Sequence, residues 1–143
     1  MLRRVFVAMT AMASLLVFGI SAAQASLRVK VDISSQRMHV YVNGGLRHVW
    51  KVSTGKRGYR TPTGSFRPTR LERSWYSRKY NWSPMPHSIF FIGGVAIHGS
   101  NYVRQLGRPA SHGCVRLARG NAARLFNLVR RHGARRTRIV VTY

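Results

Sequence analysis

The segment Ser111-His112-Gly113-Cys114-Val115-Arg116-Leu117 holds the single cysteine of this 143-residue chain. A thiol beside a histidine and a glycine indicates a nucleophile, because an imidazole can take the thiol proton and glycine leaves room for a substrate. The alternative is a buried, inert cysteine. Residues 114–117 also have the pattern of a short strand, so the candidate nucleophile is expected at the start of a strand.

The first 25 residues have the pattern of a secretory signal peptide, with Arg3 and Arg4, an apolar run over 5–20, and Ala23-Gln24-Ala25 before the cleavage point. The apolar run is shorter than the roughly 20 residues of a spanning helix, and an uncleaved anchor is the alternative. Either way, we expect residues 26–143 outside the cytoplasm. They have the length of one domain, and a single cysteine cannot form an internal disulfide, so packing alone must hold the fold.

The chain has 25 Lys and Arg against 2 acidic residues, and removal of Arg3 and Arg4 lowers its formal charge from +23 to +21. Such a charge attracts polyanions. Nucleic acid is disfavoured, because the chain is expected to be secreted and its arginines are scattered rather than gathered in a recognition motif. The remaining partners are carboxylate-rich or phosphate-rich polymers and anionic envelope surfaces. The alternative is a merely solvated basic surface.

The scarcity of acids excludes several kinds of site. Only Asp32 and Glu72 are available, and they fall in different predicted elements. Paired-carboxylate glycosidase chemistry, magnesium or calcium sites and His-Glu-x-x-His zinc proteases are therefore disfavoured. We expect no cofactor and no metal. The groups left for chemistry are Cys, His, Ser and the backbone.

Period-two alternation of apolar and polar residues predicts a mainly β fold. Asn43-Gly44-Gly45 and Thr61-Pro62-Thr63-Gly64 are turn sequences. Strands are expected over residues 27–33, 38–42, 46–53, 65–71, 89–92, 95–98, 114–117 and 137–143. The pair 89–92 and 95–98 forms a hairpin that delivers His98 at a strand end.

One helix and one long loop interrupt these strands. Apolar residues from Ala122 to Val129 recur at helical spacing, with Asn121 as the expected N-cap and Gly133 as the stop. Residues 72–88 are rich in aromatic side chains and contain prolines, which predicts a loop of the kind that often covers a site. The fold class is therefore mainly β with one substantial helix.

A thiol that attacks a carbonyl carbon at neutral pH needs a base, an acid for the leaving group and donors for the oxyanion. Gly113 lets the chain turn tightly, so the amides of His112, Gly113 and Cys114 can point at one oxygen. His98 and His112 compete for the role of base. We favour His98, because such bases more often come from another segment.

The group that orients His98 is expected to be neutral, since neither acid is close in sequence. The carbonyl or hydroxyl of Gly99 or Ser100 suits this role. A metal bound by His98, His112 and Cys114 is an alternative that lacks a fourth ligand.

These residues resemble the signature of the YkuD-type L,D-transpeptidase catalytic domain, in which His98-Gly99 and a spacer precede Ser111 to Leu117. Val52-Ser53-Thr54-Gly55-Lys56 and Thr61-Pro62-Thr63-Gly64 also resemble segments of that family, in the same order. The resemblance covers Leu27 to Tyr143. It implies a β-sandwich-like catalytic domain over residues 26–143, without an added peptidoglycan-binding module.

The resemblance also implies a reaction. In this family a cysteine attacks the carbonyl between the third stem residue and the terminal D-alanine of a peptidoglycan tetrapeptide, D-alanine leaves, and an amine of another stem peptide or of a protein resolves the thioester. By position, Cys114 is the nucleophile and His98 the base and then the acid. The amides around His112, Gly113 and Cys114 form the oxyanion hole.

The implied setting is the periplasm or cell wall, where the chain would act as a monomer in peptidoglycan biosynthesis, cell-wall organisation and cell shape. Transfer to water would instead make it an L,D-carboxypeptidase. A secreted polyanion-binding protein with a degenerate site is the alternative outside enzymes.

Substrate-lining residues are expected from the same resemblance. Ser111 and Arg116 flank the substrate, and Arg116 either pairs with a stem carboxylate or bonds loop carbonyls. Tyr80, Trp82 and Tyr102 fall where the family has a lid and a cleft wall. Core packing is the alternative for these aromatic residues.

Overall fold

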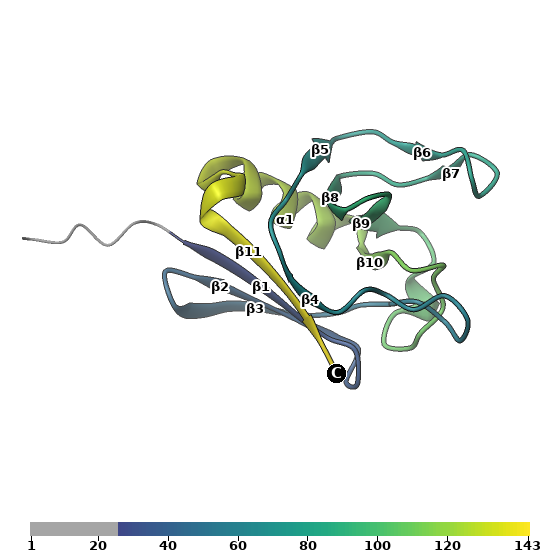
Figure 1. Cartoon of the computed structure of the whole chain (residues 1–143), viewed down its shortest axis with the longest axis horizontal. Helices are drawn as coiled ribbons and strands as arrows, with labels where there is room; N and C mark the ends of the chain where they lie inside the picture. Colours follow the sequence, from purple (N-terminus) through teal and green to yellow (C-terminus); the bar gives the residue numbers. More distant parts are fainter. Residues whose placement is uncertain (1–25) are drawn as a thin grey trace, which may run out of the picture.

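The computed structural model describes residues 26–143, which form two packed β-sheets and one long helix (Figure 1). The predicted signal peptide, residues 1–25, lies outside the described residues. Within residues 26–143, no helix has both the length and the apolar character needed to cross a membrane.

The first sheet has five strands in the order β3-β2-β1-β11-β4. An antiparallel meander is formed by β1 (Leu27–Asp32), β2 (Arg37–Val42) and β3 (Gly45–Lys51), and β11 (Thr137–Thr142) pairs in parallel with β1. The other edge is β4 (Gly64–Phe66). Alternate residues of β1, β2 and β11 are buried, because successive side chains of a strand point to opposite faces. One face of this sheet therefore supplies half of the core.

The second sheet has four strands in the order β10-β9-β8-β5. The antiparallel strands are β5 (Arg70–Glu72), β8 (Ser88–Ile92) and β9 (Val95–Ser100). In contrast, β10 (Val115–Ala118) pairs in parallel with β9. Parallel neighbours need a crossover connection. Residues 101–114, which include the short 3-10 helix η1 (Val103–Gln105), form that connection.

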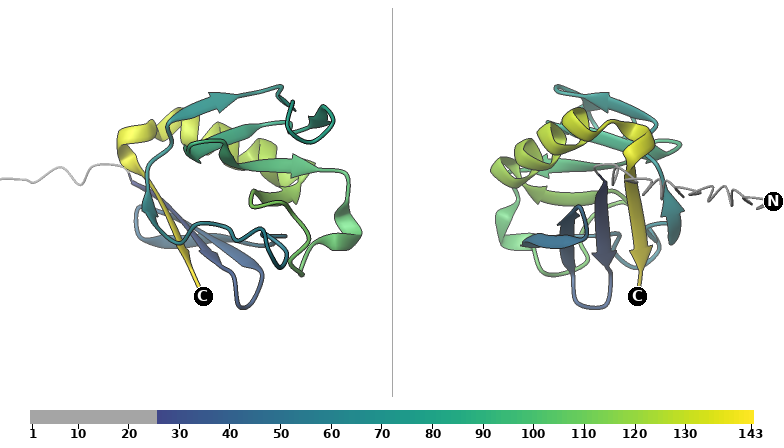
Figure 2. Two further views of the ribbon diagram at one scale, coloured as in Figure 1. Left: turned by 45° about the vertical axis from the view of Figure 1, so that its right-hand side comes forward. Right: turned by 90° about the vertical axis from the view of Figure 1, so that its left-hand side faces the viewer.

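The helix α1 (Arg119–His132) follows β10 directly and buries one apolar stripe between the sheets. That stripe consists of Ala122, Leu125, Phe126 and Val129. In the right-hand view of Figure 2 the helix runs above β1 and β11. The 3-10 helix η2 (Ala134–Arg136) then leads into β11.

A separate two-stranded hairpin, β6 (Tyr76–Ser77) and β7 (Ser83–Pro84), lies within the segment predicted as a long aromatic loop. We call residues 73–87 the hairpin lid. It projects from the β5 and β8 end of the second sheet (Figure 1).

The predicted fold class, mainly β and sandwich-like with one substantial helix, is confirmed. Three details were wrong. The strand expected over 65–71 is divided into β4 and β5 around Pro68, which cannot donate to a strand ladder. Ala118 rather than Asn121 precedes the first helical residue, because β10 runs into α1 without a loop. His98 lies inside β9 rather than at a strand end.

Leu125→Ala should lower the free energy of unfolding by about 2–5 kcal/mol, because Leu125 is fully buried between α1 and the sheets and its truncation leaves a cavity. Urea denaturation followed by circular dichroism measures this change. The matched control is Arg130→Ala, an exposed position on the same helix, which should change stability by no more than about 0.5 kcal/mol. Equal effects of the two substitutions would contradict the assigned core.

Candidate active site

A cavity of about 780 Å³ opens between the hairpin lid, β9, β10 and the turn before β10. Eight of the predicted site residues line it: His98, Ser100, Ser111, His112, Cys114, Arg116, Tyr80 and Tyr102. Trp82 does not line it; this side chain is 61% exposed on the hairpin lid, with the Arg78 guanidinium 5.6 Å from its ring centroid. The structure therefore gathers most of the predicted residues at one place.

The parallel pairing of β9 and β10 puts the thiol and the imidazole on one face of the second sheet. His98 is level with Arg116 on the neighbouring strand. Cys114 lies in the bend directly before β10 and packs against Ala96, which shares one face of β9 with His98 two residues on. The Ala96 amide donates a hydrogen bond to Cys114 Sγ at 3.5 Å, which fixes the sulfur beside β9.

His98 is buried, and its Nδ1 lies 2.7 Å from the carbonyl oxygen of Gly99. Since a carbonyl only accepts, Nδ1 carries the proton and Nε2 keeps a free lone pair. Burial lowers the pKa of His98 to about 4, the Gly99 bond opposes that change and the Arg116 charge adds to it. The ring is therefore neutral above that pH. The Ser100 hydroxyl has another partner, the Tyr102 amide at 3.1 Å.

Burial raises the pKa of the Cys114 thiol, although the Ala96 hydrogen bond and the Arg116 charge act in the opposite direction. The thiol packs at the edge of a small apolar cluster that contains Met85 and Phe90. At neutral pH the site thus holds a neutral thiol and a neutral imidazole rather than a preformed ion pair. Attack by the sulfur requires that its proton move to a base, and Nε2 of His98 is free to accept it.

The turn before β10 is braced by the Ser111 hydroxyl. Its Oγ accepts a hydrogen bond from the Gly113 amide at 3.1 Å and donates one to the Cys114 carbonyl at 2.6 Å. Gly113 has a φ of 121°, a conformation that residues with a side chain rarely adopt. The Ser111 hydroxyl therefore shapes the turn, since both of its hydrogen bonds stay within it.

Thr61 ties a distant segment to the same turn; the sequence predicted it as part of a turn and of a family-like segment, without a role of its own. Its buried Oγ1 accepts from the Gly55 amide at 2.9 Å and donates to the Gly113 carbonyl at 2.8 Å. The C=O and N–H of a trans peptide point in opposite directions. The bond to the Gly113 carbonyl therefore aims the Cys114 amide away from Thr61.

Two of the three predicted oxyanion donors are free. Among the hydrogen bonds within residues 26–143, none uses the amides of His112 and Cys114. The Gly113 amide, in contrast, already donates to the Ser111 hydroxyl. The turn can thus offer two backbone donors to one developing negative charge.

Arg116 extends from β10 across the cavity to η1. Its Nη1 donates to Gln105 Oε1 at 2.9 Å, and its guanidinium lies 5.7 Å from the Tyr102 ring centroid. This partner is a side-chain amide rather than a loop carbonyl. One such bond leaves further N–H groups of the guanidinium available for a carboxylate.

The hairpin lid rests on the turn through aromatic contacts. The Tyr80 ring stacks on the His112 ring, with centroids 4.2 Å apart and 9° between the planes. Tyr59 meets the same imidazole edge-on at 4.7 Å. His112 is therefore held between two tyrosines, which favours a role in closing the site over a role as the base.

Within residues 26–143, no three His, Cys, Asp or Glu side chains lie close enough together to hold a metal ion. The alternative of a metal bound by His98, His112 and Cys114 has no support in this geometry.

Alkylation of Cys114 by iodoacetamide should be slow at pH 7 and should rise steadily up to and beyond pH 9, because burial raises the pKa of the thiol. Intact-mass spectrometry at a series of pH values measures the rate, and Cys114→Ala shows that the adduct is on this residue. A rate that is already at its plateau below pH 7 would reveal a thiolate–imidazolium pair and contradict the neutral site.

The sequence of this chain is similar to that of a known protein family. Residues 26–141 match the family model of YkuD, the L,D-transpeptidase catalytic domain. A Bacillus subtilis protein that is provisionally named an L,D-transpeptidase, YqjB, is 30% identical over 114 residues, which cover 71% of this chain and 65% of that protein.

Solved structures share the fold. An L,D-transpeptidase from Mycobacterium smegmatis superposes with a TM-score of 0.75 at 23% identity, over 83% of this chain and 59% of that one. The L,D-transpeptidase LdtMt1, solved in complex with imipenem, superposes with a TM-score of 0.73 at 26% identity, over 82% of this chain and 59% of that one. The chain spans less than two thirds of the length of each of these relatives. On the family match over residues 26–141, the chain belongs to the YkuD family of L,D-transpeptidase catalytic domains.

Proposed function

We propose that this chain is a peptidoglycan L,D-transpeptidase whose Cys114 is acylated by a tetrapeptide stem and then transfers the acyl group to an amine. One observation supports the proposal: Cys114, directly before β10, packs against the face of β9 that carries a neutral His98, at a cavity lined by the residues of two free backbone amides. Residues 26–143 form the catalytic domain in this proposal, and the reaction places it in the periplasm or cell wall.

In the first half-reaction, Cys114 Sγ attacks the carbonyl carbon that joins the third stem residue to D-alanine, and its proton passes to Nε2 of His98. The C–N bond then breaks, His98 returns the proton to the departing amine, and a thioester remains. The Gly99 carbonyl at 2.7 Å from Nδ1 keeps the imidazole oriented and stabilises the imidazolium while it exists.

In the second half-reaction, an acceptor amine attacks the thioester and gives a proton to His98. A new amide bond forms, the C–S bond breaks, and the proton returns to sulfur, which restores the thiol. The amides of His112 and Cys114 stabilise the oxyanion in both halves. The acceptor is an amine of a second stem peptide or of a protein.

Arg116 and the hairpin lid would bind the donor stem. The guanidinium has N–H groups beyond the one bonded to Gln105, and these suit a stem carboxylate. The Tyr80 stack on His112 holds the lid against the turn.

Incubation of the protein with purified tetrapeptide muropeptides should release D-alanine and yield cross-linked dimers, as detected by mass spectrometry. Cys114→Ala should abolish both products, because the thioester cannot form. A carbapenem should give an intact-mass adduct that is absent in Cys114→Ala, since imipenem is bound in the related LdtMt1 structure.

His98→Gln should slow acylation by about 10²–10⁴-fold, the usual contribution of a general base. The control is His39→Gln, on the opposite face of β2 from the buried Met38 and Val40, which should leave the rate unchanged. D-alanine release without dimers would identify an L,D-carboxypeptidase. Absence of any Cys114-dependent product would refute the proposal.

Thr61→Val should reduce carbapenem acylation by about 10²-fold, comparable to the loss of one oxyanion donor, because the Gly113–Cys114 peptide loses the bond that fixes its orientation. Thr61→Ser keeps the hydroxyl and should retain most of the rate. Both rates are measured by intact-mass spectrometry over time.

Iodoacetamide alkylation separates this positioning role from a general loss of structure, since alkylation develops no oxyanion. Thr61→Val should change the alkylation rate of Cys114 by less than about threefold, against its expected 10²-fold effect on acylation. An equal loss in both reactions would show that Thr61 supports only the fold.

A further inference from the structure

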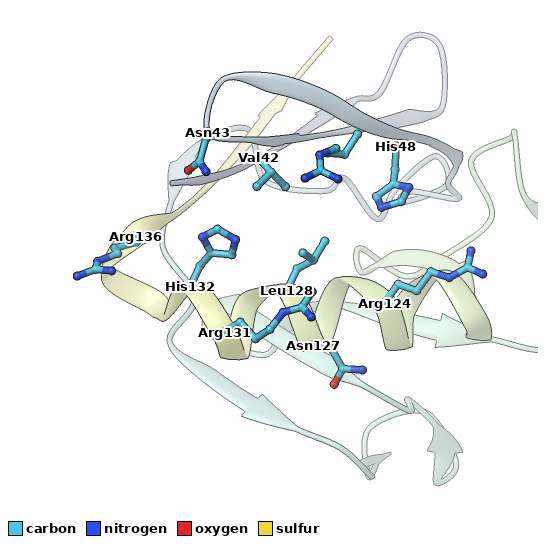
Figure 3. A pocket seen from close by; sticks show the side chains of 10 residues that line it. Val42, Asn43, His48, Arg124, Asn127, Leu128, Arg131, His132 and Arg136 are labelled. Atoms are coloured by element: carbon cyan, nitrogen blue, oxygen red, sulfur yellow. The ribbon is translucent and has the colours of Figure 1, made fainter. Parts of the chain in front are cut away.

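A second cavity, of about 670 Å³, lies between the β2–β3 hairpin and α1 (Figure 3). It shares no lining residue with the cavity at Cys114. Its charged and titratable lining side chains are four arginines and two histidines, with no acid: Arg47, Arg124, Arg131, Arg136, His48 and His132. We call the cavity that these six residues line the basic pocket.

One wall of the basic pocket is a single face of α1. Arg124, Leu128 and Arg131 lie at helical spacing of four and seven, so their side chains project from the same side. Figure 3 shows Leu128 and His132 directed from the helix towards Val42 and His48 of the hairpin. The helix thus presents its basic face across the cavity to β2 and β3.

The opposite wall of the basic pocket, formed by the β2–β3 hairpin, carries an additional positive charge because of a β-bulge. Val40 is level with His48 and Tyr41 with Leu46, so Arg47 is an extra residue in β3. Neighbouring residues of a regular strand point to opposite faces, whereas a bulge redirects a side chain. Here Arg47 and His48 both line the basic pocket, which brings one more guanidinium to this wall.

The charges in the basic pocket have no partner within the described chain. The ion pair of residues 26–143 is Arg70–Glu72, and the arginine side chains that donate hydrogen bonds there are Arg60, Arg116 and Arg119. The buried Nδ1 of His132 also has no hydrogen-bond partner in that part of the chain. Four exposed arginines thus line one cavity with no acid among them, and a bound anion would offset their positive charge.

We propose that the basic pocket binds a phosphate-bearing ligand. A guanidinium fork matches phosphate oxygens in pairs, and a phosphate group offers more charge and more oxygens than a carboxylate to several arginines at once. The volume lies within the range of small-ligand sites, about 300–1,000 Å³, and is larger than one phosphate needs. Two linked phosphates, or one phosphate with its adjoining headgroup, fit this description.

This inference is independent of the proposed function, because it does not involve Cys114 or the active-site cavity. The phosphate can belong to a soluble phosphate chain or to a lipid headgroup, which share the recognised chemistry. In either case, binding would attach the domain to a phosphate-rich component of its surroundings.

Isothermal titration calorimetry with inorganic pyrophosphate at about 0.15 M salt tests the proposal, since diffuse surface attraction is largely screened there. The double variant Arg124→Gln with Arg131→Gln should bind at least about tenfold more weakly, because hydrogen bonds to charged groups contribute strongly to affinity. The matched control removes the same charge from Arg28 and Arg138, exposed neighbours on β1 and β11 outside the basic pocket, and should stay within about twofold.

Sedimentation with phosphatidylcholine vesicles, with and without phosphatidic acid, identifies the source of the phosphate. If the Arg124 and Arg131 variant loses binding to phosphatidic acid vesicles and the control variant does not, the ligand is a lipid headgroup. If the Arg124 and Arg131 variant loses only pyrophosphate binding, and the natural chain does not bind the vesicles, the ligand is a soluble phosphate chain. No saturable binding of either probe, or equal losses in both double variants, would overturn the proposal. Circular dichroism confirms that each variant is folded, and Cys114→Ala should bind pyrophosphate as the natural chain does.

Discussion

The parallel pairing of β9 with β10 is the constraint on which the core and the candidate active site both depend. The register that sets Ile97 level with Val115 buries one face of this pair in the core, and the same register sets His98 level with Arg116 on the other face. A slip of one residue would exchange the two faces. The free energy gained by burying the apolar face therefore also fixes the relative positions of the imidazole and the thiol.

Burial determines the electrostatic character of the site. It lowers the pKa of His98 and raises the pKa of Cys114, so both groups are neutral at pH 7. The Arg116 charge favours the thiolate but disfavours the imidazolium. Its effect on the pKa of Cys114 is smaller than that of burial, so the pKa of the thiol is raised. Charge separation consequently develops only during attack, when the Gly99 carbonyl and the free amides of the turn can stabilise it.

The sequence predicted what local patterns encode, and it missed what joins distant segments. Alternation along β1, β2 and β11 predicted the sheet, and the neutral carbonyl partner of His98 followed from the lack of nearby acids. Thr61 and Gly113 are 52 positions apart, and no pattern near either residue signals their bond. The bulge at Arg47 was equally hidden, because it depends on the register between two strands rather than on the residues of one.

The basic composition of the chain likewise does not show which arginines come together in the fold. Net charge alone does not distinguish a solvated surface from a binding site, since both have the same number of arginines. The fold separates them: Arg116 is bonded to Gln105 at the active-site cavity, Arg28 and Arg138 are exposed neighbours on the first sheet, and the exposed arginines of the basic pocket line one cavity. Because no acid lies among these arginines, an anion bound in the basic pocket would stabilise the folded chain, since a ligand that binds only the folded state shifts the folding equilibrium towards it.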